Sequence, residues 1–279
     1  MEAAGVDFGP GDRVGRYRLD SVLGEGAMGV VFRAYEEGDG RVVALKVLRR
    51  ALSGDDVYKQ RFQREVRVAS EVQAAGLVPI LEGGEAGGVH YLAVEYVDGG
   101  TLEDLLEGGG PLPVADVVRI VGDIAGGLDA LHRHGVVHRD VKPSNVMLRA
   151  GGKAALTDFG LAKGRAYTVL TRPGQVMGTL DYIAPELITG GEATPASDIY
   201  ALGCVAYECA TGAAPFADRN MFEVAVAHME DEPENPVGVR PELPADLGWV
   251  ILQGLAKEPE RRPGTAVAFA NLLRVAVRA

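Results

Sequence analysis

Cysteine is scarce in this sequence: Cys204 and Cys209 are the two among 279 residues, and both lie in an apolar run. So few thiols, placed where side chains are normally buried, fit a reducing compartment and give no sign of a disulfide framework or a metal site. The sequence also lacks an apolar run long enough to span a bilayer. The N-terminus from Met1 to Ala4 lacks a basic region followed by an apolar core, which excludes a secretory signal.

The sequence also has few positively charged residues. It contains 28 Lys and Arg residues and 39 Asp and Glu residues, so its net charge is −11. That balance argues against a general surface for nucleic acid or anionic membranes. We therefore expect a soluble, cytoplasmic chain without membrane contact of its own, while membrane attachment of the natural protein beyond this segment stays open. Hydrophobic residues make up 47% of the chain, which is ordinary for a globular protein with a sizeable core.

Strand-like segments dominate the first third of the chain. Period-two patterns predict strands at Tyr17–Leu23, Val30–Tyr35, Val42–Leu48 and His90–Glu95. The turn Gly38-Asp39-Gly40 suits a hairpin, and one helix from about Val57 to Ala75 interrupts the strands.

Helical segments dominate after Asp98-Gly99-Gly100. The expected helices are Val114–His132, Ser197–Thr211, Asn220–Met229, Ala245–Ala256 and Thr265–Val277. Short strands are expected near Val146–Leu148 and Ala155–Thr157. The sequence thus predicts an α+β fold with a flexible N-terminal lead over 1–16, a strand-rich part over 17–97 and a helix-rich part over 98–279.

The stretch from His138 to Asn145 carries the clearest chemical signal. Asp140, Lys142 and Asn145 can converge on one point from a tight loop, and Asp158 follows thirteen residues after Asn145. This grouping suits attack of a hydroxyl on a metal-bound phosphate: Asp140 orients the hydroxyl, Lys142 neutralises phosphate charge, and Asn145 and Asp158 hold metal ions. The alternative is a set of ordinary turn residues, because Asp and Asn favour turns.

A glycine-rich segment near the N-terminus provides a second signal. Gly24, Gly26 and Gly29 fit a loop that covers phosphates with backbone N–H groups, although a glycine-rich hairpin turn is an equal alternative from this motif alone. Lys46 follows in a strand pattern and could contact phosphates and an acid. Glu65, the one charge in an apolar helical stripe, is the preferred partner, and Glu71 is its rival.

Three histidines, His132, His134 and His138, invite interpretation as a metal site. Their spacing does not place three imidazoles on one helix face. We interpret His132 and His134 as the C-terminal end of a helix, where imidazole suits the helix dipole, and His138 as a packing residue.

Taken together, these motifs resemble the protein kinase catalytic domain over about Tyr17 to Leu273. The segment Lys142-Pro143-Ser144-Asn145 resembles Ser/Thr kinases, and the whole pattern resembles bacterial kinases of the eukaryotic type. The resemblance implies a two-lobed fold: a small antiparallel sheet lobe with one main helix and a larger, mostly helical lobe. It also implies transfer of the γ-phosphoryl group of ATP to Ser or Thr of proteins, with Mg²⁺ or Mn²⁺, in bacterial signalling.

The resemblance also assigns individual roles. Residues implied to cover the nucleotide phosphates are Gly24, Glu25, Gly26, Ala27, Met28 and Gly29. Lys46 would contact the α- and β-phosphates and pair with Glu65. Residues implied to surround the adenine are Leu23, Val31, Ala44, Val94, Glu95, Val97 and Met147. Thr179 would bond Asp140 and Lys142 in the active site.

Structural and regulatory pairs follow from the same resemblance. Glu186 would pair with Arg262, and Asp198 would cap backbone N–H groups of the catalytic loop. Arg139 would receive an activating phosphate, with Thr171 as the first candidate site and Thr168 as the second. Self-association for autophosphorylation in trans is then expected.

Two other functions compete with an active protein kinase. A nucleotide-binding pseudokinase would have lost Lys46, Asp140, Asn145 or Asp158, and none is lost. A small-molecule kinase of similar fold usually lacks the segment Ala184-Pro185-Glu186, which is present here. Both alternatives are therefore disfavoured by the sequence.

Overall fold

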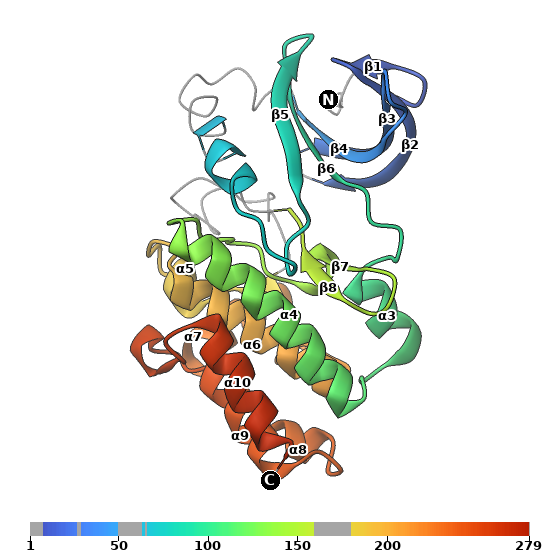
Figure 1. Cartoon of the computed structure of the whole chain (residues 1–279). Helices are drawn as coiled ribbons and strands as arrows, with labels where there is room; N and C mark the ends of the chain where they lie inside the picture. The colour runs from blue at the N-terminus through green and yellow to red at the C-terminus, as the bar shows by residue number, and fades with distance from the viewer. Residues whose placement is uncertain (1–7, 27–28, 50–62, 65, 159–179, 279) are drawn as a thin grey trace. The chain divides into compact units, whose positions relative to one another are not determined.

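The chain divides into two compact units, Met1–Gln73 with Val78–Asp98, and Ala74–Leu77 with Gly99–Ala279 (Figure 1). The structure is a computed structural model that describes residues 8–26, 29–49, 63–64, 66–158 and 180–278. Within these residues no helix combines the length and the apolar character that a bilayer span requires.

An antiparallel sheet forms most of the described part of the first unit (Figure 1). Its strands are β1 (Arg13–Val14), β2 (Tyr17–Gly26), β3 (Gly29–Glu36), β4 (Val42–Leu48), β5 (Ile80–Ala86) and β6 (Val89–Glu95). They pair in the order β1-β2-β3-β4-β6-β5. The predicted strands are confirmed, and β4 matches its prediction at both ends. β1 lies within the predicted N-terminal lead and pairs with Tyr17 and Arg18 of β2.

Alternation along the strands separates two faces of this sheet. One face packs a core of fully or nearly buried side chains that includes Leu19, Phe32, Val43, Leu45 and Val47. The other face carries Ala44 and Lys46, which are partly exposed. Val31 pairs with Lys46 and Val94 pairs with Ala44. Directly paired residues share a face, so Val31, Ala44, Lys46 and Val94 lie together on the sheet surface opposite the core.

The helix predicted from about Val57 to Ala75 is wrong at its C-terminal end. Helical residues are described at 63–64 and 66–70, and the chain has left the helix by residue 72. Gly76 packs closely against α4, because a Cβ there would lie 2.0 Å from the carbonyl oxygen of Asp123. The Gly76 carbonyl accepts the Leu156 N–H at 2.9 Å, and Leu77 forms a β-bridge to Leu156. Residues 75 and 76 therefore form a turn that leads into the bridge at Leu77.

Helices form most of the second unit (Figure 1). They are α3 (Leu102–Gly109), α4 (Val114–Arg133), α5 (Pro185–Ile188), α6 (Pro195–Thr211), α7 (Met221–Glu230), α8 (Pro236–Val239), α9 (Ala245–Gly254) and α10 (Ala266–Ala276). The short 3-10 turns are η1 (Pro143–Asn145), η2 (Leu180–Tyr182) and η3 (Pro259–Arg261), and β7 (Val146–Leu148) pairs with β8 (Ala154–Leu156). The longer predicted helices are confirmed with ends that move by one or two residues, whereas α3 was not predicted.

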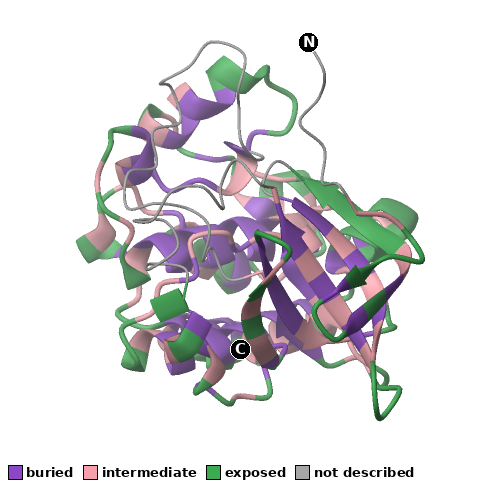
Figure 2. Cartoon of the chain, turned by 90° about the horizontal axis from the view of Figure 1, so that it is seen from above, coloured by how far each residue is buried: buried purple, intermediate pink, exposed green. Residues whose placement is uncertain are grey.

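The centre of the second unit is α6, which packs against α4 and α9. Its residues are apolar on nearly every side, and most of them are buried. Figure 2 shows buried residues in purple on both the strands and the helices. A helix that is apolar all round belongs in the middle of a helical core. The N-terminal turn of α6 carries Ser197 and Asp198, which are also buried. These polar residues position the site described next.

Candidate active site

Asp198 fixes the backbone of the predicted catalytic loop, residues 138–145. Its Oδ2 accepts the N–H of His138 and its Oδ1 accepts the N–H of Arg139, both at 2.8 Å. Asp198 is only 1% exposed. A buried carboxylate must have its oxygens hydrogen-bonded, and backbone N–H groups do so strongly. The predicted capping role of Asp198 is confirmed.

Backbone conformation marks the same region. Among the described non-glycine residues, Arg139 with φ 65° and Asp158 with φ 58° have positive φ. This conformation costs side-chain-bearing residues free energy and persists only where surrounding contacts impose it. Asp198 supplies such a contact at Arg139, because it accepts that residue's N–H. Both strained positions coincide with residues that the sequence singles out.

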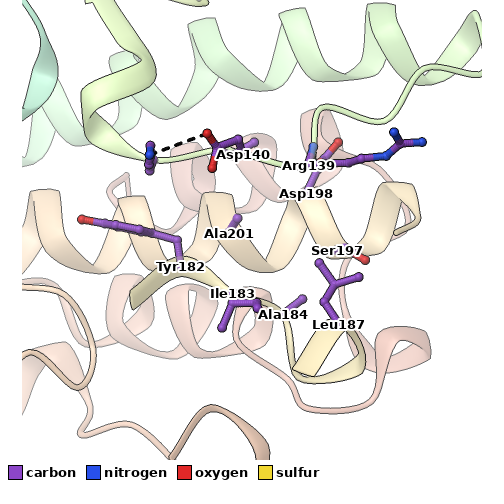
Figure 3. A pocket seen from close by; sticks show the side chains of 11 residues that line it. Arg139, Asp140, Tyr182, Ile183, Ala184, Leu187, Ser197, Asp198 and Ala201 are labelled. Atoms are coloured by element: carbon purple, nitrogen blue, oxygen red, sulfur yellow. Dashed lines mark hydrogen bonds and ion pairs between the residues drawn. The ribbon is translucent and has the colours of Figure 1, made fainter. Parts of the chain in front are cut away.

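Asn145 holds Asp140 in place. Its amide Nδ2 donates to the Asp140 carbonyl at 2.7 Å and to the Asp140 carboxylate Oδ2 at 2.9 Å. Lys142 places its ammonium Nζ 3.6 Å from the same Oδ2 (Figure 3). The Asp140 and Lys142 side chains are 21% and 20% exposed, so both reach solvent. The loop thus presents a carboxylate and a neighbouring ammonium from a fixed backbone.

Thr157 joins the catalytic loop to Asp158. The Thr157 N–H donates to the Asn145 carbonyl at 2.9 Å, and the Thr157 carbonyl lies 3.1 Å from His138 Nε2. A carbonyl only accepts, so His138 Nε2 carries the hydrogen, and its Nδ1 can accept the Asp140 N–H at 3.3 Å. Burial lowers the pKa of His138, which agrees with this neutral form. These bonds connect the residue before Asp158 to Asn145.

A pocket opens beside Asp140 and Lys142 (Figure 3). Its other side is formed by the segment that follows residue 179, including Tyr182, Ile183 and Ala184. The Tyr182 hydroxyl donates to Glu208 Oε2 at 2.6 Å. Burial raises the pKa of Glu208, and the hydrogen bond from Tyr182 acts in the opposite direction. Sequence reasoning missed the Tyr182–Glu208 pair.

The predicted ion pair between Glu186 and Arg262 is confirmed. Both guanidinium Nη atoms donate to the two carboxylate oxygens at 2.8 Å. Ser197 Oγ adds a hydrogen bond to Glu186 Oε1 at 2.8 Å. Burial by itself would raise the pKa of Glu186, but the Arg262 hydrogen bonds and charge outweigh it and lower that pKa. The pair joins α5 to the segment between η3 and α10.

The glycine-rich segment of the first unit has two kinds of glycine. A Cβ on Gly29 would lie 2.1 Å from the Val47 carbonyl oxygen, so close strand pairing requires glycine there. A Cβ on Gly24 or Gly26 would meet nothing within 4 Å. The residues that the structure describes therefore give no steric reason for glycine at these two positions. Arg49 Nη2 bonds Glu25 Oε1 at 3.0 Å and the Gly26 carbonyl at 3.2 Å.

Other predicted nucleotide-site residues are placed within their own units. Leu23 is 46% exposed, Val97 is 9% exposed, and the Glu95 N–H bonds the Pro79 carbonyl at 3.0 Å. Met147 lies in β7 and forms a β-bridge to Thr101. The predicted residues that lie outside the described part of the chain are Ala27, Met28, Glu65, Thr168, Thr171 and Thr179.

The three histidines that the sequence singles out each bond another protein group. No group of three or more His, Cys, Asp or Glu side chains suited to a metal occurs among the residues that the structure places. His132 Nε2 lies 2.8 Å from Asp198 Oδ2, and His134 Nδ1 lies 2.9 Å from the Ala130 carbonyl. His138 is fully buried. The interpretation of His132 and His134 as a helix end is confirmed, but the bond from His132 to Asp198 was missed.

The sequence is similar to a known protein family and to individual proteins of known sequence. Residues 17–272 match the family model described as protein kinase domain. The chain is 42% identical over 253 residues to serine/threonine-protein kinase PknD of Mycobacterium tuberculosis, covering 90% of this chain and 38% of that protein. PknE of the same species is 41% identical over 258 residues, covering 92% of this chain and 44% of that protein. The chain therefore spans less than half the length of these relatives.

A solved structure matches almost the whole chain. The crystal structure of the Mycobacterium tuberculosis PknI kinase domain superposes with a TM-score of 0.79 at 31% identity. The match covers 98% of this chain and 100% of that chain. The predicted division into a sheet unit and a helical unit is therefore that of a known fold.

Proposed function

This chain belongs to the protein kinase domain family, and on that premise we propose that it is the catalytic domain of a bacterial serine/threonine protein kinase. It would transfer the γ-phosphoryl group of ATP to Ser or Thr hydroxyls of proteins, its own activation segment among them. The family uses ATP and divalent metal ions and acts on protein substrates, and the predicted two-lobed α+β fold agrees with it.

One observation carries this proposal: Asn145 fixes Asp140 beside Lys142 on a loop anchored by Asp198. Asp140 Oδ2 would orient an incoming hydroxyl and accept its proton. Lys142 would stay beside Asp140 and offset negative charge on the transferred group. Phosphoryl transfer needs little besides such positioning and charge neutralisation.

The residues present fit a divalent metal ion. Asn145 donates its Nδ2 to Asp140, so its oxygen Oδ1 can serve as a ligand. Asp158 adds a carboxylate next to Thr157, whose N–H bonds the Asn145 carbonyl. One or two such oxygens are what Mg²⁺ takes from a protein when phosphates and water complete its shell. When bound, the metal neutralises phosphate charge and ATP supplies the phosphoryl group. We propose Asn145 and Asp158 as the ligands.

The nucleotide would be held by residues of the sheet unit and by Met147. Val31, Ala44, Lys46 and Val94 share one sheet face, which supports a common role toward the nucleotide. Gly24 and Gly26 would let the backbone approach its phosphates, since no described side chain or backbone atom requires glycine there. The remaining proposed nucleotide contacts are Leu23, Glu25, Ala27, Met28, Gly29, Glu95 and Val97, with Glu65 as the partner of Lys46.

Regulation would act through the activation segment, the residues between Phe159 and Ala184. We extend the proposal to phosphorylation at Thr171 first and Thr168 second, read by Arg139, with Thr179 serving Asp140 and Lys142. Transfer in trans would require transient self-association. The proposed boundaries are a lead over 1–16 and lobes over 17–97 and 98–279, and the chain would work in the cytoplasm.

The test is phosphotransfer from labelled ATP with Mg²⁺ to a generic protein substrate, beside Asp140→Asn. Transfer to Ser and Thr that disappears in the variant supports the proposal. Nucleotide binding without transfer, in the presence of an upstream activating kinase, would instead indicate a pseudokinase. Transfer to an aminoglycoside but not to protein would indicate a small-molecule kinase.

A further inference from the structure

Arg33 in β3 contacts three neighbouring side chains. Its Nη1 donates to Asp20 Oδ2 and to the Tyr35 hydroxyl, each at 2.6 Å. Its guanidinium carbon lies 4.9 Å from the centre of the Tyr35 ring and 5.7 Å from the centre of the Tyr96 ring. A guanidinium at about 6 Å or less from a ring centre is attracted to the electron-rich face of the ring. Asp20, Tyr35 and Tyr96 therefore hold Arg33 together.

The pairing of the strands explains how Arg33 meets Tyr96. Arg33 pairs with Ala44 in β4, and Ala44 pairs with Val94 in β6. Directly paired residues share a sheet face, and Tyr96 follows Val94 by two positions, which places its ring on that face as well. Because β4 separates β3 from β6, the two strands lie about 9.6 Å apart. A long Arg side chain and a Tyr ring can span this distance.

A bulge in β2 turns Asp20 toward Arg33. β2 carries one extra residue between Leu19 and Ser21, and this residue is Asp20. An extra residue in a strand re-aims the side chains around it, and here the Asp20 carboxylate reaches the Arg33 guanidinium. This ion pair limits where the guanidinium can go, and it keeps Arg33 over the Tyr96 ring.

Tyr96 stands between two proposed contacts of the adenine ring. Glu95 and Val97, its neighbours in the chain, would bond the adenine through their backbone. The Glu95 N–H is held by the Pro79 carbonyl at 3.0 Å, whereas Tyr96 and Val97 follow the end of β6 at Glu95. The side-chain contact at Tyr96 therefore restrains the backbone where strand pairing has stopped.

We propose that Arg33 is a positioning residue for recognition of the adenine ring. It holds Tyr96 from β3, and Tyr96 in turn fixes the backbone groups of Glu95 and Val97. Adenine and guanine present different donors and acceptors at their edges, so a fixed backbone at these residues would favour ATP over GTP. Arg33 acts through Tyr96 and needs no contact with the nucleotide. The kinetic part of this inference rests on the function proposed above.

The test measures KM and kcat with ATP and with GTP, and amide hydrogen exchange without nucleotide, in variants of the full chain. Arg33→Met keeps an unbranched side chain but loses the charge, so KM for ATP should rise about 2- to 10-fold, the range of a cation–π contact. KM for GTP should change less. The value of kcat should stay within about twofold of wild type, because the contact serves binding and not the transfer step. Amide exchange in residues 95–98 should quicken.

Two further substitutions identify the contact itself. Tyr96→Leu removes the ring and should reproduce the effect of Arg33→Met. The double variant should raise KM for ATP by less than the product of the two single effects, because both substitutions remove the same contact. Arg33→Lys keeps the charge but lacks the planar group that bonds and stacks at once, so its KM for ATP should lie between those of wild type and Arg33→Met.

Arg18 provides a matched control on β2. Its guanidinium carbon lies 5.3 Å from the centre of the same Tyr35 ring, and the residue is exposed. Arg18→Met removes a cation from Tyr35 and leaves Arg33 over Tyr96. It should keep the wild-type KM for ATP and the wild-type exchange in residues 95–98.

Two outcomes would overturn the proposal. In the first, Arg33→Met keeps the wild-type KM for ATP. In the second, Arg18→Met raises KM for ATP as much as Arg33→Met does, which would mean that positive charge on this sheet matters and the contact with Tyr96 does not. If the wild-type chain transfers no phosphate, the proposed function fails by itself. Exchange then still tests the contact, and wild-type exchange in Arg33→Met would refute it.

Discussion

A single nitrogen of Asn145 donates to two atoms of Asp140, the backbone carbonyl at 2.7 Å and the carboxylate Oδ2 at 2.9 Å. Asn145 is 6% exposed, so its orientation is fixed by these bonds rather than by solvent. The amide therefore serves Asp140 with its nitrogen and leaves its oxygen for a different partner. Substitutions at residue 145 can separate the two roles.

Asn145→Asp keeps oxygen ligands for a metal but replaces the donor with a carboxylate that repels Asp140. We expect kcat to fall about 10²- to 10³-fold, within the range for a displaced general base, while half-activation by Mg²⁺ changes little. Asn145→Ala removes both roles and should also need more Mg²⁺. Kinetics over a Mg²⁺ titration check this, with the exposed Asn271→Asp as control. Equal Mg²⁺ requirements in the two variants would contradict the separation of roles.

Asp140→Asn should stop catalysis and leave the fold intact. The amide oxygen can still accept from Asn145 Nδ2, so the free energy of unfolding should change by less than about 0.5 kcal/mol. The proton acceptor is lost, and kcat should fall about 10²- to 10⁴-fold with ATP affinity unchanged. Calorimetric ATP titration and phosphotransfer assays measure the two quantities. Asp116→Asn, at a surface pair with Arg119, is the control and should behave as wild type.

The sequence predicted most of the regular structure where local pattern determines it. Alternation and a glycine turn set both ends of β4, and the motif order led to the family and the two-lobed fold. The helix before Gly76 ends earlier than its periodicity suggests, and Gly76 instead lies in a turn against the α4 backbone. Helix α3 was not predicted, although Thr101 and Asp104 form a capping box that marks its start.

Tertiary partners were harder to predict than elements. The pairs Glu186–Arg262 and Asp198 with the loop came from family resemblance, not from spacing along the chain. Tyr182 and Glu208 lie 26 residues apart, and His132 and Asp198 lie 66 apart. No local pattern relates such positions, because the contacts exist only once α4 and α6 have packed. A half-buried acid within an apolar helix, Glu208, was the one available sign.

Glu186 should make stability depend on pH in the acidic range. Its folded pKa is lowered from the ordinary value of 4.5, so its contribution is present above about that pH and is lost as pH falls below it. Glu186→Gln should cost about 3 kcal/mol at pH 7, the lower end for a broken buried pair. The difference from wild type should shrink from pH 5 to pH 3 in urea unfolding.

A matched control for this pair is Glu258→Gln, which removes an exposed partner of Arg261. Its cost should stay within the range of surface ion pairs, below about 1 kcal/mol at any pH. A Glu186→Gln difference that stayed constant from pH 7 to pH 3 would show that the carboxylate charge of Glu186 does not stabilise the fold.

Tyr182→Phe should destabilise the wall of the pocket beside Asp140. Glu208 loses the hydrogen bond from the Tyr182 hydroxyl, and its pKa, already raised by burial, should rise further because that hydrogen bond opposes the rise. An acid with a raised folded pKa opposes folding once pH exceeds its ordinary value, so the cost should be larger at pH 8 than at pH 5. About 1 to 3 kcal/mol is expected at pH 8.

Glu208→Gln, alone and combined with Tyr182→Phe, separates the pair from general damage. If the hydroxyl and the carboxylate interact directly, the double variant should cost less than the sum of the single variants by at least about 0.5 kcal/mol. Urea unfolding of the four proteins at pH 8 gives the coupling. Additive costs would mean that Tyr182 stabilises the fold through its ring alone.

Glycine substitutions can distinguish a ligand-facing backbone from a packed one. Gly29→Ala brings a Cβ to 2.1 Å from the Val47 carbonyl, so β3 must shift and stability should fall by about 1 to 3 kcal/mol. A Cβ on Gly26 meets nothing within 4 Å, so Gly26→Ala should change stability by less than about 0.5 kcal/mol. If phosphates approach this backbone, Gly26→Ala should nevertheless raise KM for ATP several-fold. If Gly26→Ala is stable and keeps the wild-type KM for ATP, the segment does not contact phosphates. It would then be an ordinary glycine-rich hairpin turn, the alternative that the sequence also allows.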